Sequence, residues 1–193
     1  MASDFAEVVS RTLAASVRLH EQAQTSSVGA TVAATELMVA SLRSGGKILV
    51  CGNGGSASDS QHFAAELVGR FERERRALSS IALTTDTSIL TAIGNDYAYD
   101  RVFARQVEAL GRAGDVLLGI STSGGSRNVL EAFGAAKAGG LTTVALTGRD
   151  GGVLGAAADI HINVPSSSTA RVQEVHRTLM HAMCELIERE LYA

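Results

Sequence analysis

The stretch 47–70 constrains the fold of this chain most strongly. Residues 48–51, Ile-Leu-Val-Cys, form an apolar run with the length and β-branching of a buried strand. Residues 52–55, Gly-Asn-Gly-Gly, allow a tight turn, and Ser56 or Ser58 can cap a helix that follows. A strand, a glycine turn and a helix start together make an anion site, because free backbone N–H groups and the positive helix end point to one place.

The helix expected at about 56–71 has an apolar face and a polar face. The apolar face recurs at helical spacing and consists of Phe63, Ala64, Leu67, Val68 and Phe71. His62, Glu66 and Arg70 repeat every fourth residue on the opposite face. Such a stripe is either a solvated face or a set of functional groups, and its position beside the glycine turn favours function. The charged residues 72–76 that follow predict an exposed loop.

Length and charge limit the classes of protein to consider. The 193 residues suffice for one domain with a full core, so 1–193 is expected to be a single domain. The formal net charge of −3 gives no reason to expect nucleic acid or an anionic membrane as a partner. Any phosphate must then be held by local geometry and not by a general positive field.

The two cysteines and the apolar runs bear on the compartment. Cys51 and Cys184 lie far apart, and we interpret both as small core residues in a reducing compartment. Residues 1–25 do not have the pattern of a signal peptide, and no apolar run approaches the ~20 residues that span a bilayer. We expect a soluble, cytoplasmic protein.

Two helical patterns, 4–23 and 28–44, precede the first strand, and the second ends at Gly45-Gly46. We expect them to form a helical hairpin. Their apolar residues exceed what one small sheet can cover. Residues 1–46 are therefore expected to be an N-terminal helical extension that packs against another subunit.

Strands and helices alternate along the rest of the chain. Further strands are expected at 78–83, 116–120, 141–146 and 160–164. Helices are expected at about 87–93, 99–110, 127–137, 153–158 and 170–190. This alternation predicts an α/β three-layer sandwich with a parallel sheet flanked by helices. Ligands of such sheets bind beyond the carboxyl ends of the strands.

A second loop has the same arrangement as the first, between a buried strand and the start of a helix. Residues 121–126, Ser-Thr-Ser-Gly-Gly-Ser, separate a buried strand from the start of a helix. Their hydroxyls and free N–H groups converge on a volume that fits one phosphate. Loops of serine and glycine are common, but one between a buried strand and a helix start is a more specific sign of a phosphate site. Both loops follow strand ends, so we expect them to face one crevice.

The last helix contains two candidate histidines. Its apolar stripe consists of Val172, Val175, Leu179, Met183 and Leu186. His176 lies within that stripe and is predicted to be a hydrogen-bonded core residue. His181 lies on the other side, level with Arg177, and Gln173 lies on a flank. Spacing alone leaves open whether this polar face meets that of His62 and Glu66.

Five motifs, in order, resemble those of the phosphoheptose isomerase family of sugar isomerase (SIS) domain proteins. They are Cys-Gly-Asn-Gly-Gly-Ser at 51–56, Gln-His-Phe-Ala-Ala-Glu at 61–66, Gly-Asn-Asp at 94–96, Ser-Thr-Ser-Gly at 121–124 and Arg-Val-Gln-Glu at 171–174. The resemblance covers nearly the whole chain. It implies a five-stranded parallel sheet and a homotetramer with active sites at subunit contacts.

The resemblance also implies a set of site residues. The phosphate would be held by Ser121, Thr122, Ser123 and Ser126. Asn53, Gly54, Gly55, Ser56, Asn95 and Asp96 would lie along the sugar. We also expect His62, Glu66, Arg70 and Gln173 to contact the substrate. One zinc ion per subunit would be bound by His62, Glu66, Gln173 and His181. Histidine and carboxylate ligands four apart on a helix suit zinc, whereas a glutamine oxygen is an unusual ligand.

The implied reaction converts sedoheptulose 7-phosphate to D-glycero-D-manno-heptopyranose 7-phosphate through an enediol. It would be the first step of nucleotide-activated heptose biosynthesis, of which lipopolysaccharide is one destination. Glu66 is the candidate base and His181 the candidate proton shuttle. The alternative is a non-catalytic SIS tetramer that binds the replication initiator protein, but such proteins tend to lack equivalents of both residues. A sugar-phosphate-sensing domain is disfavoured, because no DNA-binding region is attached.

Two positions depart from the family pattern. Some relatives have an acidic residue immediately before the arginine of the last-helix motif, where this chain has Ala170. Gly125 stands where a larger residue is frequent. With Ala170, any role of that acid is absent or is supplied by another residue. Gly125 loosens the loop 121–126, which we call the serine loop, but the hydroxyls of the loop remain.

Overall fold

A parallel sheet forms the centre of the computed structural model, which describes residues 2–192 and the side chains of residues 4–192. Within this range the strands are β1 (Ile48–Gly52), β2 (Ser80–Ala82), β3 (Val116–Ser121), β4 (Thr142–Gly148) and β5 (Ile160–Val164). They pair in the order β2-β1-β3-β4-β5, and each pair is parallel. The predicted five-stranded parallel sheet is confirmed.

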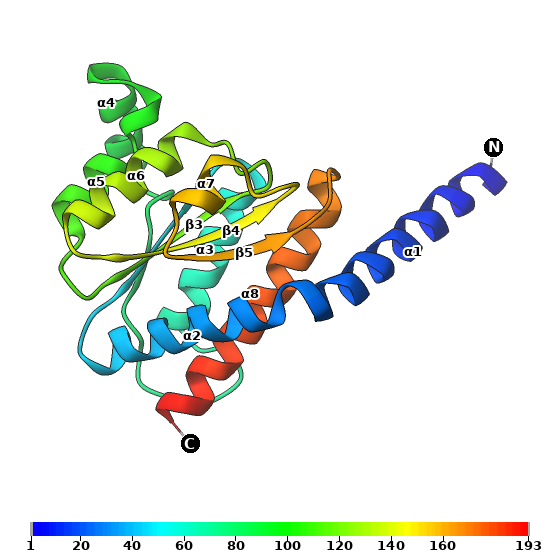
Figure 1. Ribbon diagram of the computed structural model, residues 1–193, viewed down its shortest axis with the longest axis horizontal. Helices are drawn as coiled ribbons and strands as arrows, with labels where there is room; N and C mark the ends of the chain where they lie inside the picture. Colours follow the sequence, from blue (N-terminus) through cyan, green and yellow to red (C-terminus); the bar gives the residue numbers. More distant parts are fainter. Residues whose placement is uncertain (1, 193) are drawn as a thin grey trace.

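Helices cover both faces of this sheet and complete the predicted three layers (Figure 1). One face packs against α2 (Val28–Arg43), α3 (Gly55–Val68), α8 (Thr169–Leu191) and the end of α1 (Ala2–Ser26). The other packs against α4 (Thr87–Asp96), η1 (Tyr99–Arg101), α5 (Ala104–Leu110), α6 (Arg127–Ala138) and α7 (Gly152–Ala157). Ile48 and Val50 belong to the first core and Leu49 and Cys51 to the second, as the period of two in a strand requires.

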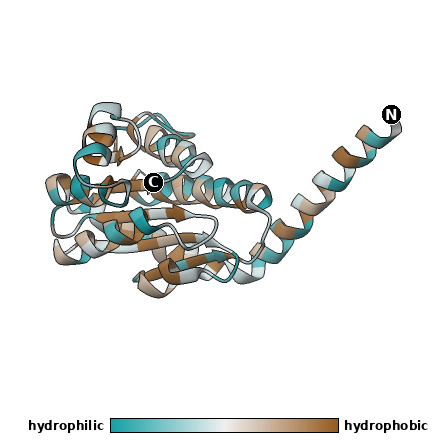
Figure 2. Ribbon diagram, turned by 90° about the horizontal axis from the view of Figure 1, so that it is seen from above, coloured by the Kyte–Doolittle hydropathy of each residue, from teal (hydrophilic) through white to brown (hydrophobic). Residues whose placement is uncertain are grey.

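The expected N-terminal hairpin is wrong. Only Ser27 separates α1 from α2, and helical hydrogen bonds continue across it, from Ser27 N–H to Ala23 O at 2.9 Å and from Thr31 N–H to Ser27 O at 3.0 Å. Two antiparallel helices need a connecting loop of about two to five residues. The nearest glycine, Gly29, already lies in the first turn of α2. The chain therefore continues forward, and the first part of α1 projects away from the body (Figures 1 and 2).

The projecting part of α1 carries an apolar stripe that the chain itself does not cover. Phe5, Val9, Leu13 and Val17 recur every fourth residue and are all exposed, Leu13 by 62%. Figure 2 shows apolar positions along this helix beyond the body. In contrast, Leu19 and Ala23, near its end, are buried in the first core. Among the described residues, no helix combines the length and apolarity that crossing a bilayer requires.

Both cysteines are core residues, as predicted. Cys51 and Cys184 are free and buried, one in β1 and the other in α8. Burial raises the pKa of both thiols to about 12. They are therefore neutral small side chains in the interior.

Candidate active site

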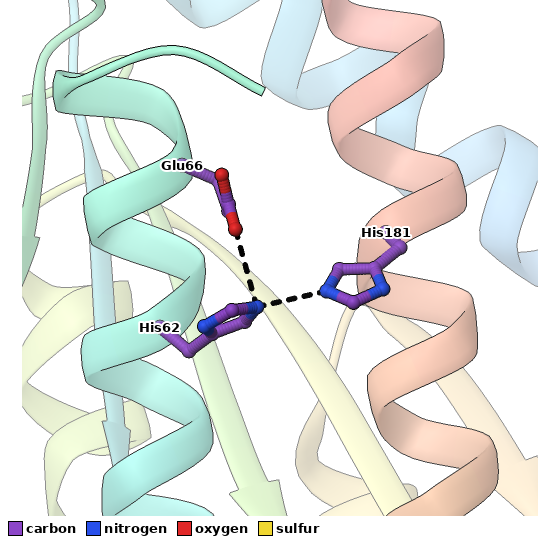
Figure 3. A group of neighbouring side chains, drawn as sticks. All are labelled: His62, Glu66 and His181. Carbon is purple, nitrogen blue, oxygen red and sulfur yellow. Dashed lines mark hydrogen bonds and ion pairs between the residues drawn. The ribbon is translucent and has the colours of Figure 1, made fainter. Parts of the chain in front are cut away.

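Three side chains from two helices converge (Figure 3). His62 and Glu66 lie one turn apart on α3, and His181 lies on α8. His62 Nε2 is 2.8 Å from His181 Nε2 and 3.2 Å from Glu66 Oε1. One donor atom from each residue lies within 4.8 Å of the others. Sequence spacing left open whether the polar faces of the two helices meet, and in the structure they do.

The cluster forms because α3 and α8 lie side by side and run in the same direction from the carboxyl edge of the sheet (Figure 1). Gly55, at the start of α3, lies against the amide of Gln173, and a Cβ at this position would clash with it. Further down, both helices carry the histidines of the cluster. The ring of Phe71 lies against that of His181, with centroids 5.5 Å apart.

The cluster is accessible but partly shielded. The side chain of His62 is 37% exposed and that of Glu66 is 21% exposed. Two imidazole nitrogens and a carboxylate oxygen are a donor set that suits zinc with a position left open for a ligand. His62, Glu66 and His181 therefore fit the metal ion that the family resemblance implies. Gln173 lies eight residues before His181, about 12 Å of helical rise, and its role as fourth ligand stays a prediction.

A cleft of about 730 Å³ opens beside these residues. It is lined by His20, Gly55, Ser58, Asp59, Ala170, Gln173, Glu174, Arg177, Thr178 and His181. Gln173, Arg177 and His181 follow one another every four residues on one face of α8. The cleft is large enough for a sugar phosphate.

The loop 121–126 brings its serine hydroxyls together at the end of β3. Ser121 Oγ lies 2.8 Å from Ser126 Oγ and 3.4 Å from Ser123 Oγ. Ser126 is the N-cap of α6 and makes no side-chain cap bond, so its hydroxyl is not used by the helix end. Hydroxyl donors next to the positive end of a helix favour an anion.

Glycine is required at one position of this loop. Gly124 has φ +67°, and a Cβ there would overlap the carbonyl of Gly151. The carbonyl of Gly124 accepts a hydrogen bond from the N–H of Leu154 at 3.0 Å. The loop is thus fixed against the residues that follow β4.

The glycine turn is bonded to the helix that follows the loop 121–126, and the shared crevice of the two loops stays a prediction. Asn53, in the glycine turn, exchanges two side-chain hydrogen bonds of 2.9 Å with Asn128, in the first turn of α6. The hydroxyl of Tyr99 donates to Asn53 Oδ1 at 3.0 Å. These bonds join the end of β1 to the helix that the serine loop begins.

Known proteins resemble this chain over most of its length. The SIS domain family model matches residues 13–148. A phosphoheptose isomerase from Neisseria gonorrhoeae (strain NCCP11945) is 57% identical over 188 residues, which cover 96% of this chain and 95% of that protein. The chain belongs to the phosphoheptose isomerase family of SIS-domain proteins. It is an isomerase.

Two further comparisons support the phosphoheptose isomerase assignment. A phosphoheptose isomerase from Roseiflexus sp. (strain RS-1) is 61% identical over 161 residues, which cover 83% of this chain and 82% of that protein. The solved structure of phosphoheptose isomerase GmhA from Neisseria gonorrhoeae matches with a TM-score of 0.92 and 54% identity. It covers 96% of this chain and 99% of that one.

Details of the glycine turn differ from expectation. Neither Ser56 nor Ser58 caps α3, because the helix begins at Gly55 with Gly54 as its N-cap and no side-chain cap bond. Ser56 is instead buried, and its N–H donates to the carbonyl of Asn53 at 3.0 Å. The N–H groups of Ala57 and Ser58 donate to the carbonyl of Gly54, so backbone bonds close the first turn of α3.

Three other predicted substrate contacts lie apart from the histidine cluster. The stripe of His62 and Glu66 does not extend to Arg70, because α3 ends at Val68 and Gly69 leaves the helical conformation. Arg70 is exposed and lies 4.0 Å from Glu74. Asn95 and Asp96 are exposed at the end of α4, where the Asn95 amide donates to Asp96 at 2.8 Å. Their contacts with substrate stay predictions.

His176 is the core residue that its position predicts. It is fully buried, and its Nε2 lies 2.9 Å from the carbonyl oxygen of Thr147. Burial lowers the pKa of His176 to about 4, against the raising effects of the Thr147 carbonyl and the charge of Asp59. A neutral, buried imidazole is a structural group and not the proton shuttle.

Sequence reasoning missed an ion pair in the cleft. Asp59 is buried, and its Oδ1 accepts from Arg177 Nη2 at 2.5 Å and from Arg177 Nε at 3.2 Å. The pair lies between the Gly55–Gln173 contact and the histidine pair. Its signal was available, since Asp59 precedes His62 by about one turn and Arg177 precedes His181 by four residues.

Proposed function

We propose that this isomerase interconverts sedoheptulose 7-phosphate and D-glycero-D-manno-heptopyranose 7-phosphate through an enediol. The observation that supports this most is the convergence of Glu66 and His181, from separate helices, in one partly buried cluster beside a cleft. The name of the relatives and the paired serine hydroxyls support a phosphorylated heptose.

Glu66 is the base in this proposal. Its carboxylate takes the proton from C1 of the ketose and returns it to C2, while a second proton moves from O1 to O2. A carboxylate that is partly removed from water and aimed at the carbon does this better than one in bulk solvent. The 21% exposure of the Glu66 side chain fits that requirement.

His181 moves the second proton. Its Nε2 lies 2.8 Å from His62 Nε2, so the two rings share a hydrogen bond in which one nitrogen donates and the other accepts. An imidazole nitrogen can take a proton from O1 and give one to O2. The same group can assist opening of a cyclic sugar.

His62, Glu66 and His181 would hold a divalent metal, and Gln173 is the proposed fourth ligand. Zinc bound there would polarise the substrate oxygens and so favour the enediolate. The residues of the chain remain responsible for holding the sugar and transferring both protons.

The phosphate rests on the serine loop in this proposal. Ser121, Thr122, Ser123 and Ser126 supply hydroxyls, and the start of α6 supplies a positive helix end. The chain's net charge of −3 makes such a local site necessary. Asn53 and the turn 54–56 then lie beside the sugar.

The assembly proposed is a homotetramer in which the α1 stripe packs against a neighbouring subunit. Phe5, Val9, Leu13 and Val17 are the residues that such packing would bury. The variant Leu13→Asp is expected to sediment as a smaller species than the wild type. Sedimentation as the same species would remove this role of α1. A cytoplasmic location is part of the same proposal.

An isomerase assay against matched sugars tests the function. Purified protein is incubated with sedoheptulose 7-phosphate or fructose 6-phosphate, and the products are separated by anion-exchange chromatography. We expect an aldose heptose phosphate from the first and no product from the second. An unchanged heptose, together with capture of the replication initiator protein, would favour the non-catalytic alternative.

A further inference from the structure

A buried ion pair lies below the histidine cluster, between the ends of α3 and α8. Arg75 Nε is 2.8 Å from Glu188 Oε1, and the two side chains are 0% and 2% exposed. Arg75 belongs to the charged cluster 72–76 that the sequence predicts to be an exposed loop. That prediction is wrong for Arg75, because its side chain turns inward to Glu188.

Glu188 also organises the backbone that follows α3. Its carboxylate accepts hydrogen bonds from the N–H groups of Phe71 at 2.9 Å, Glu72 at 3.0 Å and Arg73 at 3.0 Å. With Arg75 it therefore receives four donors. A buried charge that is paired and fully hydrogen-bonded fixes its neighbours in one arrangement.

Arg75 makes the matching contacts on the side of α3. Its guanidinium donates to the carbonyl oxygens of Glu66 at 2.7 Å, Leu67 at 2.8 Å and Gly69 at 3.3 Å. These belong to the last turn of α3 and its C-cap, where carbonyls have no helical partner and a cation is favoured. Arg75 is thus bonded directly to the backbone of Glu66.

Both ends of this network reach the cluster. Glu188 lies seven residues after His181 on α8, about 10 Å of helical rise. Phe71, whose N–H is bound by Glu188, places its ring against the ring of His181. The network therefore contacts Glu66 through Arg75 and His181 through Phe71.

We propose that Arg75 and Glu188 are positioning residues, which fix α3 against α8 so that Glu66 and His62 meet His181. The inference rests on the function proposed for that cluster. A buried ion pair often adds little net stability compared with an apolar pair, so the value of this one lies in the arrangement it specifies. The alternative is a pair that only stabilises the fold.

A second buried pair provides a matched control. Asp115 accepts from Lys47 Nζ at 2.5 Å, from Lys47 N–H at 2.9 Å and from Arg112 N–H at 2.8 Å. It too is a buried carboxylate bound by one cation and backbone donors. It joins the amino ends of β1 and β3, at the edge of the sheet away from the cluster.

The test compares Glu188→Gln with Asp115→Asn. Metal-free protein is titrated with Co²⁺, whose visible absorption reports binding by imidazole and carboxylate, and thermal unfolding is recorded for each variant. We expect Glu188→Gln to weaken Co²⁺ binding by about 10- to 100-fold, which is the usual effect of losing a residue that holds metal ligands in position. We expect Asp115→Asn to lower the unfolding temperature and leave Co²⁺ affinity within about twofold of wild type.

Kinetics adds a second readout. Glu188→Gln should lower kcat and leave KM for the sugar phosphate nearly unchanged. The serine loop follows the carboxyl end of β3, at the sheet edge from which α3 starts, whereas Glu188 bonds to residues beyond the end of α3. If Glu188→Gln does not fold, Glu188→Asp replaces it, since one methylene less also displaces the bonds to residues 71–73. Wild-type Co²⁺ affinity in the folded variant would overturn the positioning role alone. Failure of the wild type to bind Co²⁺ would overturn both this inference and the proposed metal site.

Discussion

His62 Nε2 lies 2.8 Å from His181 Nε2, although 119 positions separate the two residues in the sequence. At this distance one nitrogen must donate and the other accept, so the two rings cannot both carry a proton on Nε2. Glu66, 3.2 Å from His62, completes a group with one carboxylate and two imidazoles. Such a group can hold a metal and exchange protons with a sugar.

Glu66→Gln is expected to fold and bind substrate but to lose most turnover. The amide keeps the size of the side chain and cannot act as a base, so kcat should fall by roughly 10²–10⁴-fold. Circular dichroism and KM check folding and binding. Glu72→Gln, at an exposed position, is the control and should keep wild-type kcat. Near-normal turnover by Glu66→Gln would remove this residue from the role of base.

Metal removal should lower activity, and zinc should restore it. His62, Glu66 and His181 present their donors within 4.8 Å of one another, which favours one ion per subunit. Inductively coupled plasma mass spectrometry of the purified enzyme should find zinc, and His181→Ala should lose it. Equal activity before chelation, after chelation and after zinc addition would argue against a catalytic ion.

The serine loop offers two adjacent glycines with opposite expectations. In Gly124→Ala the new Cβ meets the Gly151 carbonyl at a positive φ, so the loop must move and phosphate binding should weaken. We expect KM to rise by about tenfold or more, the effect of losing one hydrogen bond to a charged group. In Gly125→Ala the nearest atom is Ser123 Oγ at 3.8 Å, and KM should stay near wild type. The reverse order of the two variants would contradict the phosphate site.

Stability should depend on pH through His176. The unfolded chain binds a proton at this residue below about pH 6.5, whereas burial lowers the folded pKa to about 4. The free energy of unfolding should therefore fall as pH drops through this window, by about 3 kcal/mol for this group. Urea unfolding at several pH values between 7 and 4.5 gives the slope of the free energy of unfolding against pH. His176→Gln should reduce this slope by up to the equivalent of one bound proton. If His176→Gln kept the wild-type slope, protonation of His176 would not be the source of the pH dependence. His20→Gln serves as the control.

Most of the fold follows from local sequence patterns. Apolar runs such as 48–51 and 116–120 mark strands, and the strict alternation with helices requires parallel pairing. The N-terminal hairpin could not be settled in this way. The residues between the two helical patterns permit either a turn or a continuing helix, and Ser27 is held by a bond from its hydroxyl to the Asn163 carbonyl, which is remote in sequence.

Part of the candidate site likewise follows from local spacing, and part depends on how distant helices pack. His62 and Glu66 share a helix face, and their spacing alone places them together. Their meeting with His181 depends on how far α8 slides along α3, which no periodicity specifies. Arg75 and Glu188, which fix this register, were hidden because a charged residue in a charged run normally points to solvent.

Transfer of the proton from C1 to C2 is the central claim, and NMR of sedoheptulose 7-phosphate labelled with ¹³C at C1 tests it most directly. With the wild type in D₂O, we expect the labelled carbon to change from a hydroxymethyl to an anomeric signal, with deuterium at C2 wherever the proton on Glu66 exchanges with solvent. Glu66→Gln should leave the hydroxymethyl signal in place. An unchanged signal with the wild type, or conversion by the variant at the wild-type rate, would contradict the account.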